Sequence, residues 1–351
     1  MSDTKSGAKP NGGQAGGRST GEGDGGTFNV LISSCGRRGA LVRIFRSSLK
    51  KRGLSGRVLG ADASPLSAAL QMCDDGFLVP RCTDAAFIPA MVDLCRRHSI
   101  KLIVPTIDTE LAIYAEARGR LSAVGTTVAV SAIETIRIGE DKARTHRWLI
   151  DSGFPAVRQW GKDEIPDSAL FPLMGKPRFG SASMGIITIE NRNQLALVSE
   201  REAMVFEERA PGREYTVDVF VDRRGQCRCA VPRLRLEVRG GEVSKAMTTR
   251  QRQLQALATE IAESLPGAFG VMNIQVFIDP KDGSMKVIEI NPRFGGGFPL
   301  TWQAGADYPL WLIQDALGER CEARPDSWED GLVMLRFDDA VFVSAGAVGL
   351  T

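Results

Sequence analysis

Long apolar runs are absent from this sequence. No window of the 351 residues approaches the roughly 20 consecutive apolar residues that a membrane-spanning helix needs. The N-terminus is polar and rich in glycine, without the apolar core of a signal peptide. We therefore expect a cytoplasmic protein that does not act on membranes.

Histidine is scarce, and the cysteines are not arranged in pairs. The chain has two histidines and seven scattered cysteines, an odd number that suits a reducing compartment better than a disulfide framework. Cys227 and Cys229 form the one close pair, and alternating strand positions explain it better than zinc, because a second pair of ligands is missing. Catalysis through a histidine-based triad is not expected.

The chain also lacks an excess of either charge. Lys and Arg number 44 and Asp and Glu 42, so the net charge of +2 gives no reason to expect nucleic-acid binding. The 43% hydrophobic and 25% charged residues exclude collagen-like and wholly disordered classes. Residues 1–26 contain nine glycines but no Val, Ile, Leu or Phe, which predicts a disordered tail.

Apolar segments alternate with helical patterns over residues 27–131. Four segments read as strands, and helical spacing of apolar residues separates them; the strands are expected at 28–32, 56–62, 76–80 and 101–106. Unbroken apolar strands of this kind indicate a parallel sheet with helices on both faces. The first domain is therefore predicted to be Rossmann-like, with Gly36, Asp62 and Asp108 at the carboxyl ends of its strands.

The turn after the first strand partly resembles a dinucleotide-binding fingerprint. Gly36 and Gly39 enclose two arginines, and Asp62 follows 26 residues after Gly36. The third glycine of G-x-G-x-x-G is missing, so a tight turn that any doubly wound sheet needs is the competing interpretation. Both remain open at this point.

The pattern of apolar residues changes after residue 131. Residues 133–152 read as two helices, and most of the later chain reads as strands separated by Gly and Pro turns, with helices at 252–265 and 308–317. This half is expected to be mixed α+β.

Two adjacent strands of this half carry oxygen-bearing side chains in alternation. Gln275 lies on a strand expected at 271–278. Glu289 lies on the next, expected at 285–290, and Asn291 directly follows it in the same extended course. Neighbouring strands are only about 4.8 Å apart, so the three side chains can converge while Ile288 and Ile290 pack behind them. An all-oxygen set of this kind suits Mg²⁺. The alternative to a metal site is that the two strands simply expose polar faces to solvent.

Two lysines and a loop of small residues lie upstream. Lys176 precedes Pro177 and the loop 180–185, whose backbone N–H groups could fold over phosphates, and Lys142 is in the first turn of a helix. Each lysine alone is more often a solvated surface residue, but together with a magnesium set they favour a nucleotide site. The glycine triplet after Arg293 fits a close approach of backbone to phosphate.

Together these residues resemble the ATP-grasp enzymes, in particular one synthetase half of the carbamoyl phosphate synthase large subunit. The resemblance covers residues 29–335, and its most specific part is Glu289, Ile290, Asn291, Pro292 and Arg293. It implies an ATP-grasp fold with a pre-ATP-grasp domain over 27–131, a small lid-bearing subdomain over 132–205 and a larger C-terminal subdomain over 206–351. ATP is then expected between two antiparallel sheets, with Mg²⁺, for which Mn²⁺ is a candidate substitute.

The resemblance also assigns roles by position. Lys142 and Lys176 match the phosphate-binding lysines, and Gln275, Glu289 and Asn291 match the magnesium ligands. Arg293 matches the arginine that steadies the transferred phosphate. The remaining nucleotide contacts implied by the resemblance comprise the lid, the adenine-reading hinge and the ribose-binding acid: Gly180, Ser181, Ser183, Met184, Glu207, Glu208, Arg209, Ala210 and Glu214.

This family activates a carboxylate as an acyl phosphate and then transfers it to a nucleophile. One synthetase module without a glutaminase makes carbamoyl phosphate synthesis a poor fit, so we expect a small-molecule carboxylate and an amine or amino acid as substrates. Arg235, Lys245 and Gly296 are weaker candidates for substrate contact, and a homodimer is considered. The alternatives are acyl or carbamoyl phosphate formation, a nucleotide-binding protein without turnover, and a dehydrogenase.

Overall fold

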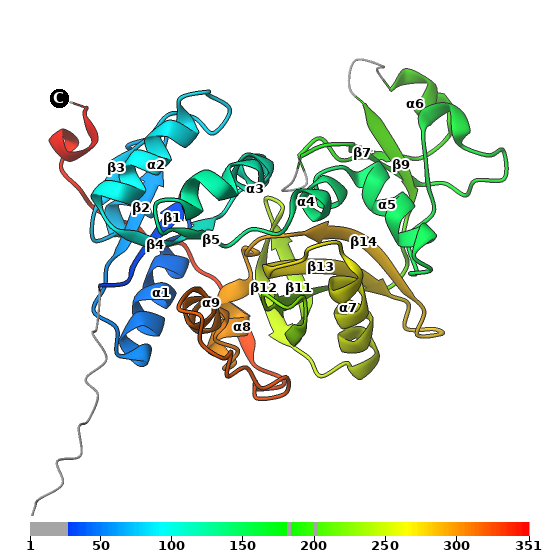
Figure 1. The fold of residues 1–351 in the computed structure, drawn as a ribbon. Coiled ribbons are helices and arrows are strands. Elements are labelled where there is room, and N and C mark those ends of the chain that lie inside the picture. Colours follow the sequence, from blue (N-terminus) through cyan, green and yellow to red (C-terminus); the bar gives the residue numbers. More distant parts are fainter. Residues whose placement is uncertain (1–26, 181–183, 199–202, 351) are drawn as a thin grey trace, which may run out of the picture.

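The computed structural model describes residues 27–180, 184–198 and 203–350. The predicted tail at 1–26 lies outside these ranges. Three sheets make up the fold, and Figure 1 shows the small sheet at one end of the molecule and the N-terminal sheet at the other. No helix in the described part of the chain is long and apolar enough to cross a membrane.

The N-terminal sheet is parallel throughout, in the order β3-β2-β1-β4-β5. Buried residues of alternate parity along the strands pack against α1 on one face and against α2 and α3 on the other, which confirms the doubly wound prediction. The helical pattern near residue 70 shrinks to one 3₁₀ turn, Leu70–Met72. The elements are β1 (Asn29–Ser33), α1 (Gly39–Arg52), β2 (Val58–Asp62), β3 (Gly76–Leu78), α2 (Phe87–Arg97), β4 (Ile100–Pro105), α3 (Asp108–Ser122) and β5 (Thr127–Val128).

A small antiparallel sheet with its own core comes next along the chain. Its strand order is β6-β9-β7-β8. The helix α5 begins after its N-cap residue Asp141, whose carboxylate accepts hydrogen bonds from the backbone N–H groups of residues 143 and 144. The strand β9 runs across the expected domain boundary at 205/206. The elements are α4 (Ile133–Gly139), α5 (Lys142–Asp151), β6 (Gln159–Trp160), β7 (Leu173–Pro177), β8 (Ile187–Ile189), α6 (Arg192–Leu197) and β9 (Met204–Glu208).

The largest sheet has six antiparallel strands in the order β14-β13-β10-β11-β12-β15. The helix α7 covers its apolar face, where Leu254 and Ile261 pack under the strands. The elements are β10 (Arg213–Val221), β11 (Cys227–Arg239), β12 (Glu242–Thr248), α7 (Arg252–Ser264), β13 (Gly270–Ile278), β14 (Met285–Asn291) and β15 (Val333–Leu335).

Two further helices join the first and last parts of the chain. The helices α8 (Phe298–Gln303) and α9 (Tyr308–Ala316) share one hydrophobic core with α1, whereas the large sheet and α7 have a separate core, so the expected C-terminal subdomain contributes to two cores. At this junction Ser48 donates a hydrogen bond of 2.7 Å to Asp307. A final 3₁₀ turn, Ala345–Val348, returns to the N-terminal domain (Figure 1).

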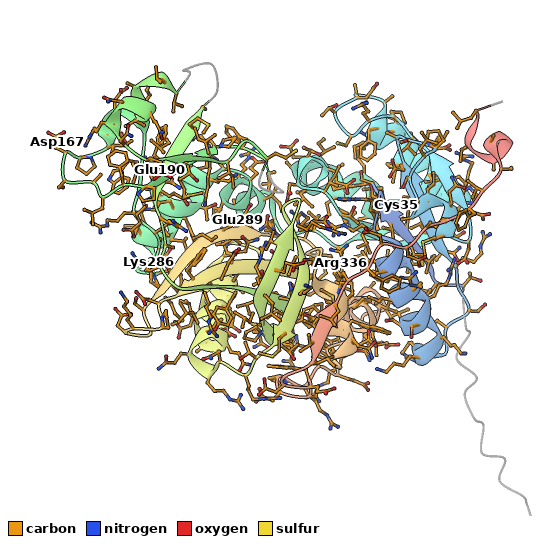
Figure 2. The ribbon with its side chains drawn as sticks, turned by 180° about the vertical axis from the view of Figure 1, so that it is seen from behind. Cys35, Asp167, Glu190, Lys286, Glu289 and Arg336 are labelled. Carbon is orange, nitrogen blue, oxygen red and sulfur yellow. The ribbon has the colours of Figure 1, made fainter. Side chains whose placement is uncertain are left out.

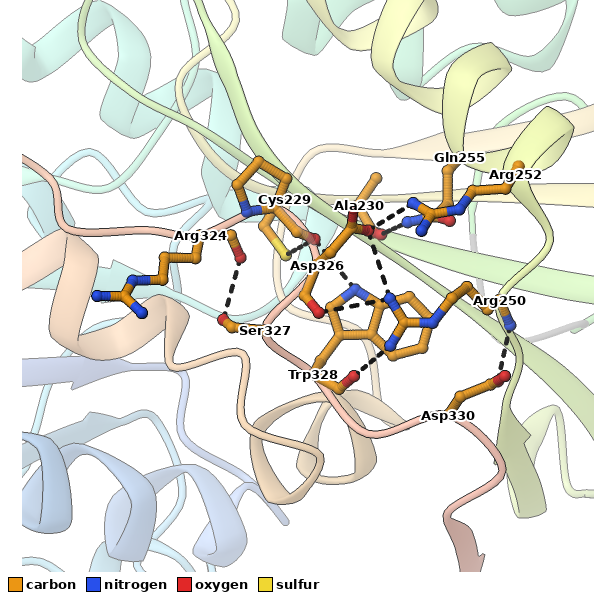
Figure 3. Close-up of polar contacts among 11 residues, drawn as sticks. Cys229, Ala230, Arg250, Arg252, Gln255, Arg324, Asp326, Ser327, Trp328 and Asp330 are labelled. Carbon is orange, nitrogen blue, oxygen red and sulfur yellow. Dashed lines mark hydrogen bonds and ion pairs between the residues drawn. The ribbon is translucent and has the colours of Figure 1, made fainter.

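The segment after α9 is anchored on a buried tryptophan (Figure 3). Trp328 is 2% exposed, and the guanidinium of Arg250 stacks 4.4 Å from its ring centroid. Arg250 also donates to the carbonyl of Trp328 at 2.6 Å, and its backbone N–H donates to Asp330 at 2.8 Å. These contacts hold residues 326–330 against the start of α7, and thereby position the edge strand β15.

We predict that Arg250→Ala lowers the thermal midpoint by several degrees, because it removes a cation–π contact and a charge-assisted hydrogen bond worth about 1–3 kcal/mol together. Arg324→Ala is the matched control, since the side chain of Arg324 points away from the network (Figure 3). Differential scanning fluorimetry compares the two variants. Equal midpoints for both would contradict the anchoring role of Arg250.

Candidate active site between the three sheets

The six-stranded sheet presents one apolar and one polar face. Along β10, Val217 and Val219 are buried over α7, whereas the alternate residues Glu214 and Thr216 line cavities on the opposite face. Glu289 lies on that polar face, near the middle of the molecule, between the small sheet and the domain that carries Cys35 (Figure 2). The local pattern of period two therefore creates the floor of the site.

The register of β13 against β14 brings the predicted metal ligands together. Gln275 pairs with Glu289, and Asn273 pairs with Asn291 one step further along. The amide of Asn291 donates to the side-chain oxygen of Asn273 at 3.3 Å. Gln275, Glu289 and Asn291 thus share one face, as the sequence predicts.

One detail of the strand prediction is wrong. Ile290 packs in the core over α7. Ile288, in contrast, lines a cavity on the polar face of the sheet. The cause is an irregularity of register: Gln275 pairs with Glu289 but Val276 pairs with Val287, so Ile288 is an extra residue on β14. A β-bulge of this kind reverses the alternation locally and turns an apolar side chain toward the cavity.

The polar set fits a hard divalent cation. Glu289 supplies one carboxylate, and Gln275 and Asn291 supply amide oxygens, donors that Mg²⁺ accepts when water and phosphate oxygens complete its coordination. In the described ranges, no three His, Cys, Asp or Glu side chains gather into a metal site. Zinc or another soft metal therefore has no suitable ligand set in this part of the chain.

Two connected cavities lie over the polar face. The larger, of about 1030 Å³, is bounded by the small sheet and the strands β10, β13 and β14, and the smaller, of about 240 Å³, reaches toward the N-terminal sheet. Both are lined by Arg235, Gly241, Gln275 and Glu289, so two of the predicted metal ligands lie where the cavities meet, and the third, Asn291, lines the smaller one. The larger is also lined by Lys142, Lys176, Gly180, Met184, Glu207, Glu208, Arg209, Ala210 and Glu214.

Both predicted phosphate lysines line the larger cavity. Lys176 pairs with Glu207 at 2.5 Å, in a pair whose side chains are only 12% and 3% exposed. Lys142 donates to the carbonyl of Gly180 at 2.7 Å. Burial lowers the pKa of the Lys142 ammonium, and Lys176 adds to this effect while the nearby carboxylate of Glu289 opposes it. The site therefore gathers two cations in a place shielded from water.

The rim at the end of β9 is held by ion pairs. Glu208 accepts hydrogen bonds from Arg158 at 2.9 Å and from Lys286. Burial raises the pKa of Glu208, but the bonds from Lys286 and Arg158 outweigh it and leave the pKa below its usual range. Figure 2 shows Lys286 on the same strand as Glu289. The strand β14 therefore supports both the rim and the metal ligands.

Arg293 is oriented by an acid from the N-terminal domain. Its Nε and Nη2 donate to the two carboxylate oxygens of Asp108 at 2.8 and 2.7 Å, a bidentate pair with both side chains largely buried. Asp108 is the first residue of α3, at the carboxyl edge of the parallel sheet. Both residues line the smaller cavity, so this pair joins the N-terminal domain to the site.

Of the three weaker candidates for substrate contact, two line a cavity and one does not. Arg235 and Gly296 line the smaller cavity, and Arg235 pairs with Glu214 at 3.0 Å. Burial raises the pKa of Glu214, which Arg235 counteracts. Lys245 lines neither cavity: its side chain is exposed on β12 and pairs with Glu237 at 2.7 Å.

The predicted lid is only partly described. Gly180 and Met184 line the larger cavity, whereas Ser181 and Ser183 lie outside the described residues. Packing within the protein also explains a glycine of the triplet 295–297, for which close approach to a phosphate was expected. A Cβ on Gly297 would stand 2.2 Å from Nη1 of Arg233, so a side chain of this chain already requires glycine there.

The turn after β1 is closed by its own acid. The carboxylate of Asp62 accepts a hydrogen bond from the backbone N–H of Gly36 at 2.8 Å. That bond joins the turn to the end of the neighbouring strand β2 and uses the acid within the protein, which supports the tight-turn interpretation of Gly36 and Asp62 over the dinucleotide one.

Comparison with known proteins agrees with this geometry. Residues 30–129 match the family model described as PylC-like, N-terminal domain, and residues 200–339 match the model described as ATP-grasp in the biosynthetic pathway with Ter operon. Residues 200–339 are thus similar to an ATP-grasp family. The chain is 25% identical over 312 residues to the carbamoyl phosphate synthase large chain of Clavibacter michiganensis subsp. michiganensis, which covers 79% of this chain and 28% of the relative. The chain thus spans little more than a quarter of that relative's length.

Solved structures share the ATP-grasp fold. The biotin carboxylase domain of the Hydrogenobacter thermophilus 2-oxoglutarate carboxylase, in complex with MgADP, has a TM-score of 0.69 at 19% identity, over 87% of this chain and 73% of that one. The N5-carboxyaminoimidazole synthetase of Staphylococcus aureus has a TM-score of 0.65 at 16% identity, over 84% and 78%. The L-amino acid ligase of Bacillus licheniformis has 0.64 at 18%, over 85% and 77%.

Some residues of this site were not singled out from the sequence. Asp108 was expected at a strand end and, as part of the segment 106–110, near the acceptor pocket, but its partner was not, and Lys286 carried no expectation of its own. Their partners are far away in sequence, 185 residues in the case of Asp108 and Arg293, so spacing gives no signal. The acid at the carboxyl edge of a parallel sheet was the one available hint.

The lowered pKa of Lys142 predicts a pH effect on nucleotide binding. The ammonium is charged below its folded pKa, so affinity for ADP with Mg²⁺ should fall as the pH rises toward and past that pKa, by about tenfold when the charge is lost. Lys142→Arg should keep its affinity at high pH, since guanidinium stays charged. Calorimetric titration between about pH 7.5 and 10 measures both.

Lys281→Arg serves as the control for that titration, because Lys281 is exposed and lines neither cavity. This variant should follow the wild-type profile. An equal decline of affinity in Lys142→Arg would show that another group causes the pH dependence.

Proposed function

We propose that this protein is an ATP-dependent ligase that activates a substrate carboxylate as an acyl phosphate and couples it to an amine. The observation that carries the proposal is the position of Gln275 and Glu289, which line both cavities at their junction. A metal ion held by these two residues would contact the nucleotide phosphates in one cavity and the acceptor substrate in the other. Small molecules are the substrates that cavities of these sizes fit.

The larger cavity is proposed to hold the nucleotide. Lys142 and Lys176 would contact its phosphates, and the backbone of 207–210 would face the adenine. Glu214 would accept hydrogen bonds from the ribose, at a position where Arg235 already orients it. Ordered cations inside a closed site stabilise phosphate charge without solvent reorganisation, which is the main protein contribution to phosphoryl transfer.

Gln275, Glu289 and Asn291 are proposed to hold Mg²⁺, with Mn²⁺ as a substitute of the same ligand preference. The bound cation would neutralise charge on the phosphate oxygens. Glu289 contributes the one anionic ligand of the three, so the affinity of the site for the cation depends mainly on this residue.

The reaction is assigned to the groups around the junction. An oxygen of the substrate carboxylate attacks the γ-phosphorus, the bond to the bridging oxygen breaks, and ADP leaves. The amine nitrogen next attacks the acyl carbon, and inorganic phosphate leaves as the amine loses a proton. Arg293, fixed by Asp108, would balance the negative charge that develops on the phosphoryl group.

The solved neighbours support this class, because their names include an L-amino acid ligase and an N5-carboxyaminoimidazole synthetase. The carbamoyl phosphate synthase relatives favour one second candidate, release of the acyl or carbamoyl phosphate itself.

All seven cysteines are free thiols, which suits the cytoplasm. We further propose a homodimer, which sedimentation velocity tests.

A screen for ADP release tests the function. Amino acids and small carboxylic acids are supplied in pairs with ATP and Mg²⁺, and ADP is measured by a coupled assay. Release that needs both members of a pair supports the ligase. Release with one carboxylate alone, together with a hydroxamate when hydroxylamine is added, indicates that the acyl phosphate is the product. No release with any pair contradicts the proposal.

We predict that Glu289→Gln lowers Mg²⁺-dependent turnover about a hundredfold or more, because the neutral amide removes the one carboxylate from the metal ligands. The fold should persist, since the side chains are nearly equal in shape and Glu289 lies at the cavity wall. Glu260→Gln, an exposed change on α7, is the control. Full activity of the Glu289 variant, assayed over a range of Mg²⁺ concentrations, would refute the metal assignment.

A further inference from the structure

The smaller cavity contains guanidinium groups whose donors are not all used. Arg38 lies at the turn between β1 and α1 and lines this cavity, yet its guanidinium forms no hydrogen bond or ion pair with any residue in the ranges 27–180, 184–198 and 203–350. Burial lowers the pKa of Arg38, and the charge of Arg293 adds to this, while Glu242 and Asp108 oppose it. An arginine held in a shielded place without a direct partner is uncommon.

A second guanidinium reaches the same cavity from β11. Arg233 is 1% exposed and binds Asp218 through Nε and Nη2, at 2.8 and 3.0 Å. Its Nη1 is buried and has no hydrogen-bond partner among the described residues. This nitrogen lies 2.2 Å from where a Cβ on Gly297 would be, and both residues line the cavity. A buried donor without an acceptor costs free energy unless a ligand supplies one.

The carboxylates around this cavity, in contrast, already have cations. Asp108 binds Arg293, and Glu242 binds Arg336 of the C-terminal segment at 3.1 Å. Figure 2 shows Arg336 in that segment. Glu289 faces the proposed metal. The missing complement of the cavity is therefore an anion and not a further cation.

Arg38 and Arg233 approach the same stretch of backbone. Nη1 of Arg38 lies 3.4 Å from the position of a Cβ on Gly296, next to the glycine that accommodates Arg233. Gly296 and Gly297 themselves carry no side chain, which leaves room for a ligand beside Arg38. The carboxylate of Glu242 also lies 3.4 Å from the Cβ position of Gly296, but it is paired with Arg336. The volume of about 240 Å³ corresponds to about eight water molecules in the liquid, which suits a ligand of amino-acid size.

We propose that the small substrate of this protein carries a second anionic group, a carboxylate or a phosphate, and that Arg38 binds it above Gly296 with Arg233 behind it. The inference rests on the proposed ligase function, because it assigns the smaller cavity to the substrate that meets the nucleotide at Glu289. Arg38 is then a residue that determines specificity, and the reacting carboxylate lies at the other end, near Arg293.

Paired ligands test the second anion directly. L-glutamate is compared with L-glutamine, O-phospho-L-serine with L-serine, and glutarate with butyrate, each titrated calorimetrically into the protein saturated with ADP and Mg²⁺. In at least one pair the anionic member should bind about tenfold or more tightly than its partner. The glutamate, glutarate and phosphoserine titrations separate a carboxylate site from a phosphate site. Equal or absent binding in all three pairs overturns the proposal.

Variants then locate the effect. Arg38→Gln should abolish the preference for the anionic member, and Arg38→Lys should restore part of it. Arg37→Gln is the matched control, since Arg37 is the neighbouring residue but its side chain is 86% exposed. Unchanged preference in Arg38→Gln, with the variant folded by its thermal midpoint, overturns the assignment of Arg38.

The two proposals can fail separately. If anionic ligands bind through Arg38 but no substrate pair releases ADP, the ligase function fails and the anion site remains. If ADP is released with substrates that carry a single anionic group, and Arg38→Gln does not raise their KM, the ligase function holds and the anion site fails.

Discussion

The pairing of β13 with β14 is the constraint on which the site depends. Ile274 pairs with Ile290, and both are fully buried over α7, while Gln275 and Glu289 pair on the opposite face. A slip of one residue would exchange the two faces of β14 and place Glu289 in the apolar core. Packing of the isoleucines therefore fixes where the oxygen ligands stand, and a hydrophobic preference determines the geometry of a metal site.

The two cavities are built from parts that differ in how firmly they are connected. The smaller one lies between the N-terminal sheet and the large sheet, which share a core through α1, α8 and α9 and are bound by Asp108 and Arg293. The larger one has a wall from the small sheet, which has a separate core. The proposed acceptor cavity is accordingly more preorganised than the proposed nucleotide cavity, where the bond from Lys142 to Gly180 joins α5 to the end of the segment after β7.

Sequence reasoning reached the parallel sheet from its unbroken apolar strands, and the shared face of Gln275, Glu289 and Asn291 from period-two alternation. The two antiparallel sheets followed from the family resemblance and not from the pattern of residues. Sequence reasoning failed where a local rule is broken or a partner is distant. The extra residue at Ile288 reversed the alternation, and nothing in the apolar composition of β14 marks it. The pairing of Asp108 with Arg293 joins strand ends 185 residues apart, which only the assembled fold brings together.

Ion pairing within the cavities explains why the net charge of +2 says little about which ligands the protein binds. Lys176 binds Glu207, Arg293 binds Asp108 and Arg235 binds Glu214, so most cations of the site enter the folded state already paired, which avoids the cost of an isolated buried charge. A phosphate that reaches these groups must compete with a carboxylate already in place. Arg38 has no such partner in the described residues, so an anion bound there gains a contact without displacing one. Selectivity for a second anionic group is therefore expected to depend on Arg38 more than on the paired arginines.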